Sequence, residues 1–230
     1  MNNRRSILFC ISFILLSGCA HKEPPLEQPG EELISQNVES NAKGEKSSPK
    51  EITTEPIRKG ESGITIQKDG KVSNELMDLA QTKLALLPSN VKDAFLNDGW
   101  DIILTDMDLN LTFYNGKYTE VLGNTIYGEG IIYIKSDEQA VNQAILHEIG
   151  HWLDFHLGYV TDSDEFRTIF EKEANSYIQN YQTTCVRNPK ELFAETFWQY
   201  VENPQKLEIL NPKLYWFMKE TVENTKTEPF

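Results

Sequence analysis

The sequence His147-Glu148-Ile149-Gly150-His151 decides how the rest of this chain is interpreted. We expect it to lie in a helix over about Asp137 to Leu157, with a cap at Ser136 and a stop at Gly158. In a helix, residues four apart differ by about 40° around the axis. Both imidazoles therefore project from one face, one turn apart, where they can bind the same Zn²⁺ ion.

Glu148 lies about 60° from His151 around the same helix. It can sit beside a metal ion without binding it, where a general base would accept the proton of an attacking water molecule. The alternative is a chance match in which both histidines are ordinary surface residues. Only four histidines occur in the chain, which makes a chance pairing the weaker interpretation, and we predict one zinc ion per chain.

A catalytic zinc site also needs a third protein ligand and an open fourth position. The sequence Glu191-Leu-Phe-Ala-Glu195-Thr-Phe supplies two carboxylates four residues apart, which a helix places on one face. One of them can bind the metal while the other supports the site from behind. The residues alone leave open which one binds, because Glu191 could instead form a capping pair with Asn188 and Glu195 could be a solvated helix residue.

The other patterns between residues 62 and 230 predict a few strands followed by helices. Helices are expected over residues 74–87, 91–96 and 166–181 and after the Asn-Pro pairs at 188 and 211. Strands are expected over residues 100–105 and 111–114 and on both sides of a glycine turn within 124–134. This order is typical of an α+β domain with a small sheet, an active-site helix and a helical C-terminal half.

The first 61 residues differ in character from the rest. Arg4 and Arg5 precede an apolar run that ends at Cys19, which is typical of a signal peptide over residues 1–18. Residues 19–61 are rich in Glu, Pro, Lys, Ser and Asn and contain no aromatic residue, so we expect a disordered tether. The folded domain is then residues 62–230.

The net charge of the chain is −13, and residues 62–230 carry most of it, with 14 basic against 26 acidic side chains. Contacts with a phosphate backbone need a basic face. We therefore expect no nucleic-acid partner.

The junction Leu16-Ser17-Gly18-Cys19 resembles the lipobox of bacterial lipoproteins. The resemblance implies cleavage before Cys19 and attachment of palmitate-like acyl chains to this cysteine. Two or more acyl chains are enough for stable membrane anchoring. We expect a lipid-anchored protein on the extracytoplasmic face of the cell membrane, and the usage of 17 Lys to 5 Arg points to a Gram-positive host.

Four segments together resemble the catalytic domain of anthrax lethal factor and its relatives, which include the secreted Pro-Pro endopeptidases. The segments are residues 147–151, 166–173, 191–197 and 211–217. The resemblance covers about residues 99–222 and implies a zincin-like metallopeptidase fold that hydrolyses extended segments of protein substrates. It also implies that Glu191 is the third zinc ligand and that Glu195 supports the site.

The same resemblance implies a tyrosine shortly before the zinc-ligand glutamate, whose hydroxyl stabilises the oxyanion of the tetrahedral intermediate. The family spacing falls on Thr184 here, so we assign the role to Tyr181, with Tyr177 as the alternative. An extended peptide would pair with the edge of the sheet. We expect this edge strand to be Ile131-Ile132-Tyr133-Ile134.

The resemblance does not extend to the residues that select proline. The Pro-Pro endopeptidases carry an acidic residue just before the zinc-ligand glutamate and a Lys/Trp pair upstream, where this chain has Lys190 and Met107-Asp108-Leu109. We expect a monomeric metalloendopeptidase with protein or peptide substrates. The alternatives are a catalytically inactive lipoprotein that binds zinc or peptides and, among enzymes, a peptidoglycan amidase.

Overall fold

The computed structural model describes residues 62–227, so the predicted signal peptide, Cys19 and the tether lie outside the described residues. In chain order the elements are β1 (Ile66–Asp69), α1 (Asn74–Ala85), α2 (Ser89–Asp98), β2 (Asp101–Thr105), α3 (Leu109–Tyr114), β3 (Gly123–Ile126), β4 (Ile131–Lys135), α4 (Glu138–Gln143), α5 (Ile145–His156), the 3-10 turn η1 (Val160–Asp162), α6 (Asp164–Tyr181), α7 (Pro189–Glu202), α8 (Pro204–Leu210) and α9 (Pro212–Glu223). The fold is α+β, as predicted. Within residues 62–227, none of the helices combines the length and apolarity needed to span a membrane.

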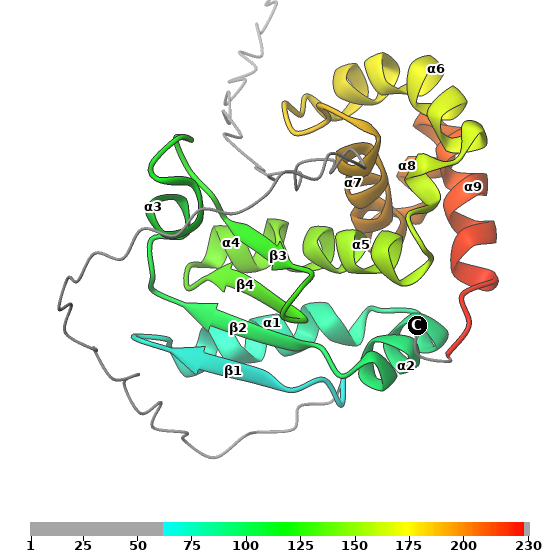
Figure 1. Cartoon of the computed structure of the whole chain (residues 1–230). Coiled ribbons are helices and arrows are strands. Elements are labelled where there is room, and N and C mark those ends of the chain that lie inside the picture. Colours follow the sequence, from blue (N-terminus) through cyan, green and yellow to red (C-terminus); the bar gives the residue numbers. More distant parts are fainter. Residues whose placement is uncertain (1–61, 228–230) are drawn as a thin grey trace, which may run out of the picture.

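The strands form one sheet in the order β1-β2-β4-β3 (Figure 1). β1, β2 and β4 are parallel, whereas β3 runs antiparallel to β4, with Gly123 opposite Ile134. The predicted edge strand Ile131–Ile134 is therefore wrong, because β4 is paired on both sides. The chain folds back as a β3–β4 hairpin, and β3 takes the edge. Strand β1 was not predicted from the sequence.

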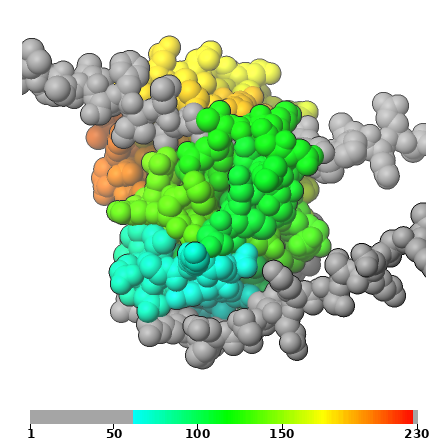
Figure 2. Space-filling model, turned by 90° about the vertical axis from the view of Figure 1, so that its left-hand side faces the viewer, coloured from blue at the N-terminus to red at the C-terminus, as the bar shows by residue number. Residues whose placement is uncertain are grey.

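One face of the sheet is covered by helices. Alternate strand residues, among them Ile102, Leu104, Ile132 and Ile134, are fully buried and pack into the main core with α1, α4 and α5. The small helix α3 packs against Tyr133 on the opposite face. Helices α6 to α9 gather on the side of α5 that faces away from the sheet (Figure 1). In Figure 2 the green residues around α3 lie between the cyan beginning of the fold and the yellow helix α6.

Three local predictions are corrected by the structure. Residues 111–114 are part of helix α3, because the Asp108 side chain accepts a hydrogen bond from Leu111 N and caps a helix there. The expected single helix over residues 137–157 is two helices, α4 and α5, which meet at Ala144, where φ widens to −96°. Asp137, and not Ser136, caps the first of them by accepting from Ala140 N.

Helix α5 is held from behind, which determines the direction of its motif histidines. Trp152 is fully buried, packs edge-to-face with Phe95 and donates a hydrogen bond from Nε1 to Asp98 Oδ2 at 3.0 Å. The same carboxylate oxygen lies 2.8 Å from His156 Nδ1. With this side of α5 anchored on α2, the opposite side faces α7.

Candidate metal centre

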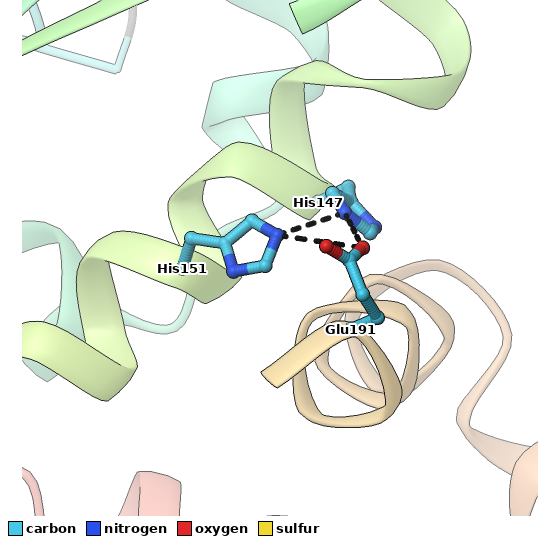
Figure 3. A group of neighbouring side chains, drawn as sticks. All are labelled: His147, His151 and Glu191. Carbon is cyan, nitrogen blue, oxygen red and sulfur yellow. Dashed lines mark hydrogen bonds and ion pairs between the residues drawn. The ribbon is translucent and has the colours of Figure 1, made fainter. Parts of the chain in front are cut away.

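Three side chains from two helices meet between α5 and α7 (Figure 3). His147 and His151 come from α5, and Glu191 comes from the first turn of α7. The Nε2 atoms of the two histidines lie 3.0 Å apart. Glu191 Oε2 lies 3.3 Å from His147 Nε2 and 3.7 Å from His151 Nε2.

These separations fit a tetrahedral metal ion. With bonds of about 2.0–2.1 Å to nitrogen and oxygen, two ligand atoms of a tetrahedral zinc ion lie about 3.3–3.4 Å apart. The three measured distances scatter around this value. Two imidazoles and one carboxylate are also a ligand set that catalytic zinc sites use, with a fourth position left for water or substrate.

The first turn of α7 shows why Glu191 is available to this group. The Asn188 side chain accepts a hydrogen bond from the Glu191 backbone N–H at 3.1 Å and so caps the helix by itself. Pro189 follows at the first helical position, where its missing N–H costs nothing. The Oε2 atom of Glu191 faces both histidines, so Glu191 is the glutamate that the geometry places with them.

Glu195 lies one turn further along α7, behind the group. Its Oε1 atom is 3.3 Å from His147 Nδ1, on the side of the ring opposite the atom that faces Glu191. A carboxylate in this position fixes the orientation of a metal-binding imidazole and makes it a better ligand. The backbone carbonyl of Glu195 accepts a hydrogen bond from the Tyr177 hydroxyl at 3.0 Å, which ties α7 to α6.

The two sides of the group are electrically complementary. Burial alone would lower the pKa of His147, but the nearby carboxylates of Glu191 and Glu195 outweigh it and hold the pKa well above its ordinary value. Burial would likewise raise the pKa of Glu191, but its contacts with His147 and His151 lower it instead.

Glu148 lies beside the group without joining it. Its Oε2 atom accepts a hydrogen bond at 2.6 Å from Thr125 Oγ1, which belongs to the edge strand β3. Burial raises the pKa of Glu148, and the positive charges of His151 and His147 oppose this increase. An ideal Cβ added to Gly123 would lie 2.8 Å from Glu148 Cγ, so only glycine leaves room for this carboxylate under β3.

Gly150 allows α5 and α7 to approach closely at the level of the ligands. An ideal Cβ at this position would lie 2.8 Å from Ala194 Cα, closer than such atoms come in folded proteins. Gly150 lies between the two histidines in sequence, and Ala194 lies between the two glutamates. The two halves of the site are therefore brought together by backbone contact.

The predicted oxyanion tyrosines lie on α6. Tyr177 is fully buried, and its hydroxyl is used in the hydrogen bond to Glu195. Tyr181 stacks on Tyr177 at a centroid distance of 4.4 Å, lies 4.5 Å from Lys206 Nζ of α8, and has its pKa raised to about 12 by burial. Among the described residues, these two contacts hold the Tyr181 ring between α6 and α8. Its catalytic role stays a prediction.

A second hydroxyl, that of Tyr127 directly after β3, was not predicted from the sequence. Burial raises the pKa of Tyr127 well above its ordinary value, and the charges of Glu148 and Asp154 add to the increase. Gly123 and Thr125 of β3 both contact Glu148, and Tyr127 follows two residues after Thr125, at the start of the turn that ends the strand.

Comparison with known proteins agrees with this architecture. Residues 64–221 match the family described as "Anthrax toxin lethal factor, N- and C-terminal domain". Among solved structures, the Pro-Pro endopeptidase PPEP-2 from Paenibacillus alvei is similar, with a TM-score of 0.54 and 21% identity over 67% of this chain and 96% of that chain. At this identity the likeness is one of fold. No curated protein sequence matches the chain.

Proposed function

This chain belongs to the anthrax toxin lethal factor domain family, and on that premise we propose that it is a zinc metalloendopeptidase acting on extended segments of protein substrates. The observation that carries the proposal is the position of Glu148. It lies next to the three candidate ligands, is held by Thr125 and has a raised pKa. A site that only stores a metal ion has no use for such a carboxylate.

Each residue has a role that its contacts support. His147, His151 and Glu191 would hold the ion, and bound zinc lowers the pKa of water to about 7 and polarises a substrate carbonyl. Glu148 accepts the proton of the attacking water and passes it to the leaving amine. Glu195 keeps the His147 ring in position through its contact with Nδ1.

The remaining parts of the proposal concern the substrate and the location. We expect an extended peptide to pair with β3, because β3 is the edge strand and its residues Gly123 and Thr125 contact the general base. The oxyanion hydroxyl would come from Tyr181, as the family resemblance implies, or from Tyr127, which directly follows the edge strand β3. Cleavage before Cys19 and acylation would anchor the monomeric chain on the outer face of the membrane.

The test uses the full chain in detergent micelles with a peptide library, and compares it with Glu148→Gln and with Glu171→Gln, an exposed glutamate on α6. Metal content is determined for all three proteins. We expect one zinc ion in each, with the library cut by the parent and by Glu171→Gln. The Glu148→Gln variant should lose about a hundredfold to ten-thousandfold in rate, the share of a general base.

Two results would count against the proposal. Cleavage by Glu148→Gln at the parental rate would remove Glu148 from the reaction. If all three proteins hold zinc and none cuts any peptide, the chain is better described as a zinc-binding or peptide-binding lipoprotein without catalytic activity.

A further inference from the structure

Four aromatic side chains form a cluster that we name the aromatic shelf. They are Trp100, Tyr127, Phe155 and Tyr159. The ring centroids of Tyr127 and Phe155 lie 5.4 Å apart, those of Phe155 and Tyr159 5.8 Å, and those of Trp100 and Phe155 5.6 Å. All four residues are partly exposed. Partly exposed aromatic rings gathered in one place are typical of a binding surface.

The shelf lies directly beside the candidate metal centre. Phe155 is one helical turn beyond His151 on α5. Tyr127 directly follows β3, whose residue Thr125 donates a hydrogen bond to Glu148. An extended peptide paired with β3 and placed over the metal ligands would therefore continue onto these rings.

Tyr159 holds its place in the shelf through an unusual backbone conformation. Its φ and ψ angles are 61° and 63°, the left-handed region that residues other than glycine seldom occupy, and Gly158 before it also has a positive φ. The conformation is held by Asp154, whose backbone oxygen accepts from Tyr159 N at 2.7 Å and whose carboxylate accepts two hydrogen bonds from Thr161. A strained residue held so firmly next to a metal site points to a functional constraint.

Lys190 adds a positive charge at the same end of the site. Its Nζ atom lies 4.4 Å from the centroid of the Tyr159 ring, a cation–π contact, and its backbone immediately precedes Glu191. Lys190 is itself partly exposed. In a domain with a large excess of acidic side chains, a cation beside the metal ligands is available for an acidic group of a bound peptide.

We propose that the aromatic shelf and Lys190 form a substrate subsite for a large apolar side chain with an acidic residue next to it in the peptide. The rings would cover the apolar side chain, and the ammonium group of Lys190 would pair with the neighbouring carboxylate. This subsite would set the substrate preference of the proposed endopeptidase, so the inference rests on that proposed function.

The test measures binding and cleavage separately, so that the two proposals can fail separately. Labelled peptides of Ser and Gly carry one Phe-Glu, Phe-Lys or Ala-Glu pair. Their binding to the zinc-loaded full chain with Glu148→Gln is followed by fluorescence anisotropy, and their cleavage by the chain with Glu148 intact is followed by mass spectrometry. The variants are Phe155→Ala, Tyr159→Phe and Lys190→Glu.

The chain offers a matched control pair far along the sequence on α9. Trp216 is 53% exposed, and Lys219 Nζ lies 4.7 Å from its ring, the same kind of contact as in the shelf. Trp216→Ala and Lys219→Glu remove an aromatic ring and reverse a charge away from the shelf. Zinc content and thermal unfolding are measured for every variant.

We expect the Phe-Glu peptide to bind best. Phe155→Ala should reduce the preference for Phe over Ala about fivefold to tenfold, the loss typical of a central interface side chain, and Tyr159→Phe, which keeps the ring, should retain it. Lys190→Glu should turn the preference for Phe-Glu into one for Phe-Lys, a change of about tenfold or more. The two controls should bind like the parent.

Other outcomes separate the two proposals. Cleavage that continues with parental preferences in both Phe155→Ala and Lys190→Glu overturns the subsite and leaves the endopeptidase standing. Shelf-dependent binding without cleavage by the chain with Glu148 intact supports the subsite and overturns the enzymatic function. Equal effects from the shelf and control variants would overturn the subsite.

Discussion

Replacing Gly150 by alanine tests whether close contact between α5 and α7 builds the metal site. An ideal Cβ there would lie 2.8 Å from Ala194 Cα and 3.1 Å from Ala194 O. Carbon atoms in favourable contact are about 3.5–4.0 Å apart, so the helices must separate by roughly 0.7 Å. That shift exceeds the tolerance of about 0.2 Å in metal–ligand distances, and it moves Glu191 away from His147 and His151.

The expected cost has two opposing parts. Overpacking a tight contact typically costs about 1–3 kcal/mol, while the higher helix propensity of alanine returns at most about 1 kcal/mol. We expect a net loss of about 1–2 kcal/mol in the free energy of unfolding, which lowers the Tm of a domain of this size by roughly 2–8 °C. Zinc affinity should fall by about tenfold or more, because the ligands no longer converge.

The assay is thermal unfolding of the full metal-free chain, followed by zinc titration against a fluorescent chelator. Gly128→Ala is the control, since a Cβ at this position would meet no other group of the described chain within 4 Å. It should keep both the Tm and the zinc affinity of the parent. If Gly150→Ala binds zinc as tightly as the parent, the helix contact does not determine the ligand geometry and the reasoning is wrong.

Two further predictions concern the charges of the site. Thr125→Val removes the hydrogen bond to Glu148 and should raise the pKa of this carboxylate, so the acid limb of the pH–rate profile moves to higher pH. We expect kcat/KM to fall about tenfold while the zinc content is unchanged. An unaltered profile would exclude the contact from the mechanism. Zinc binding by the metal-free chain should release a proton, and the zinc affinity should rise with pH, because His147 has a raised pKa next to Glu191 and must lose its proton to bind metal. Calorimetry in two buffers of different ionisation enthalpy measures the proton release. Equal heats of binding in the two buffers would contradict the prediction.

Much of the site was predictable because it depends on short-range periodicity. Residues 147 and 151 share a helix face whatever the helix packs against, and residue 148 lies beside them for the same reason. The signals for helix starts were equally local. Asn188 caps α7 through its own side chain, as the Asn-Pro pair indicated.

Local signals failed where a neighbour in space decides the outcome. The apolar pattern of residues 111–114 predicts a strand, because the pattern does not include the helix cap that the Asp108 side chain provides. The sequence predicts β4 as the edge strand, because the antiparallel return of β3 depends on pairing between two segments and leaves no local signal. From the sequence, only the family resemblance indicates which of Glu191 and Glu195 is the third metal ligand. In the structure, the position of α7 relative to α5 determines which of the two carboxylates faces the Nε2 atoms of the histidines.

The sequence by itself therefore determined the chemistry of the site: two imidazoles one turn apart, an adjacent carboxylate and a second helix with two more carboxylates. Only the tertiary structure decided the distances between α5 and α7, the identity of the edge strand and the assembly of the aromatic shelf. The physical reason is that backbone geometry repeats over a few residues, whereas Trp100, Tyr127, Phe155 and Tyr159 meet only after distant segments have packed against one another.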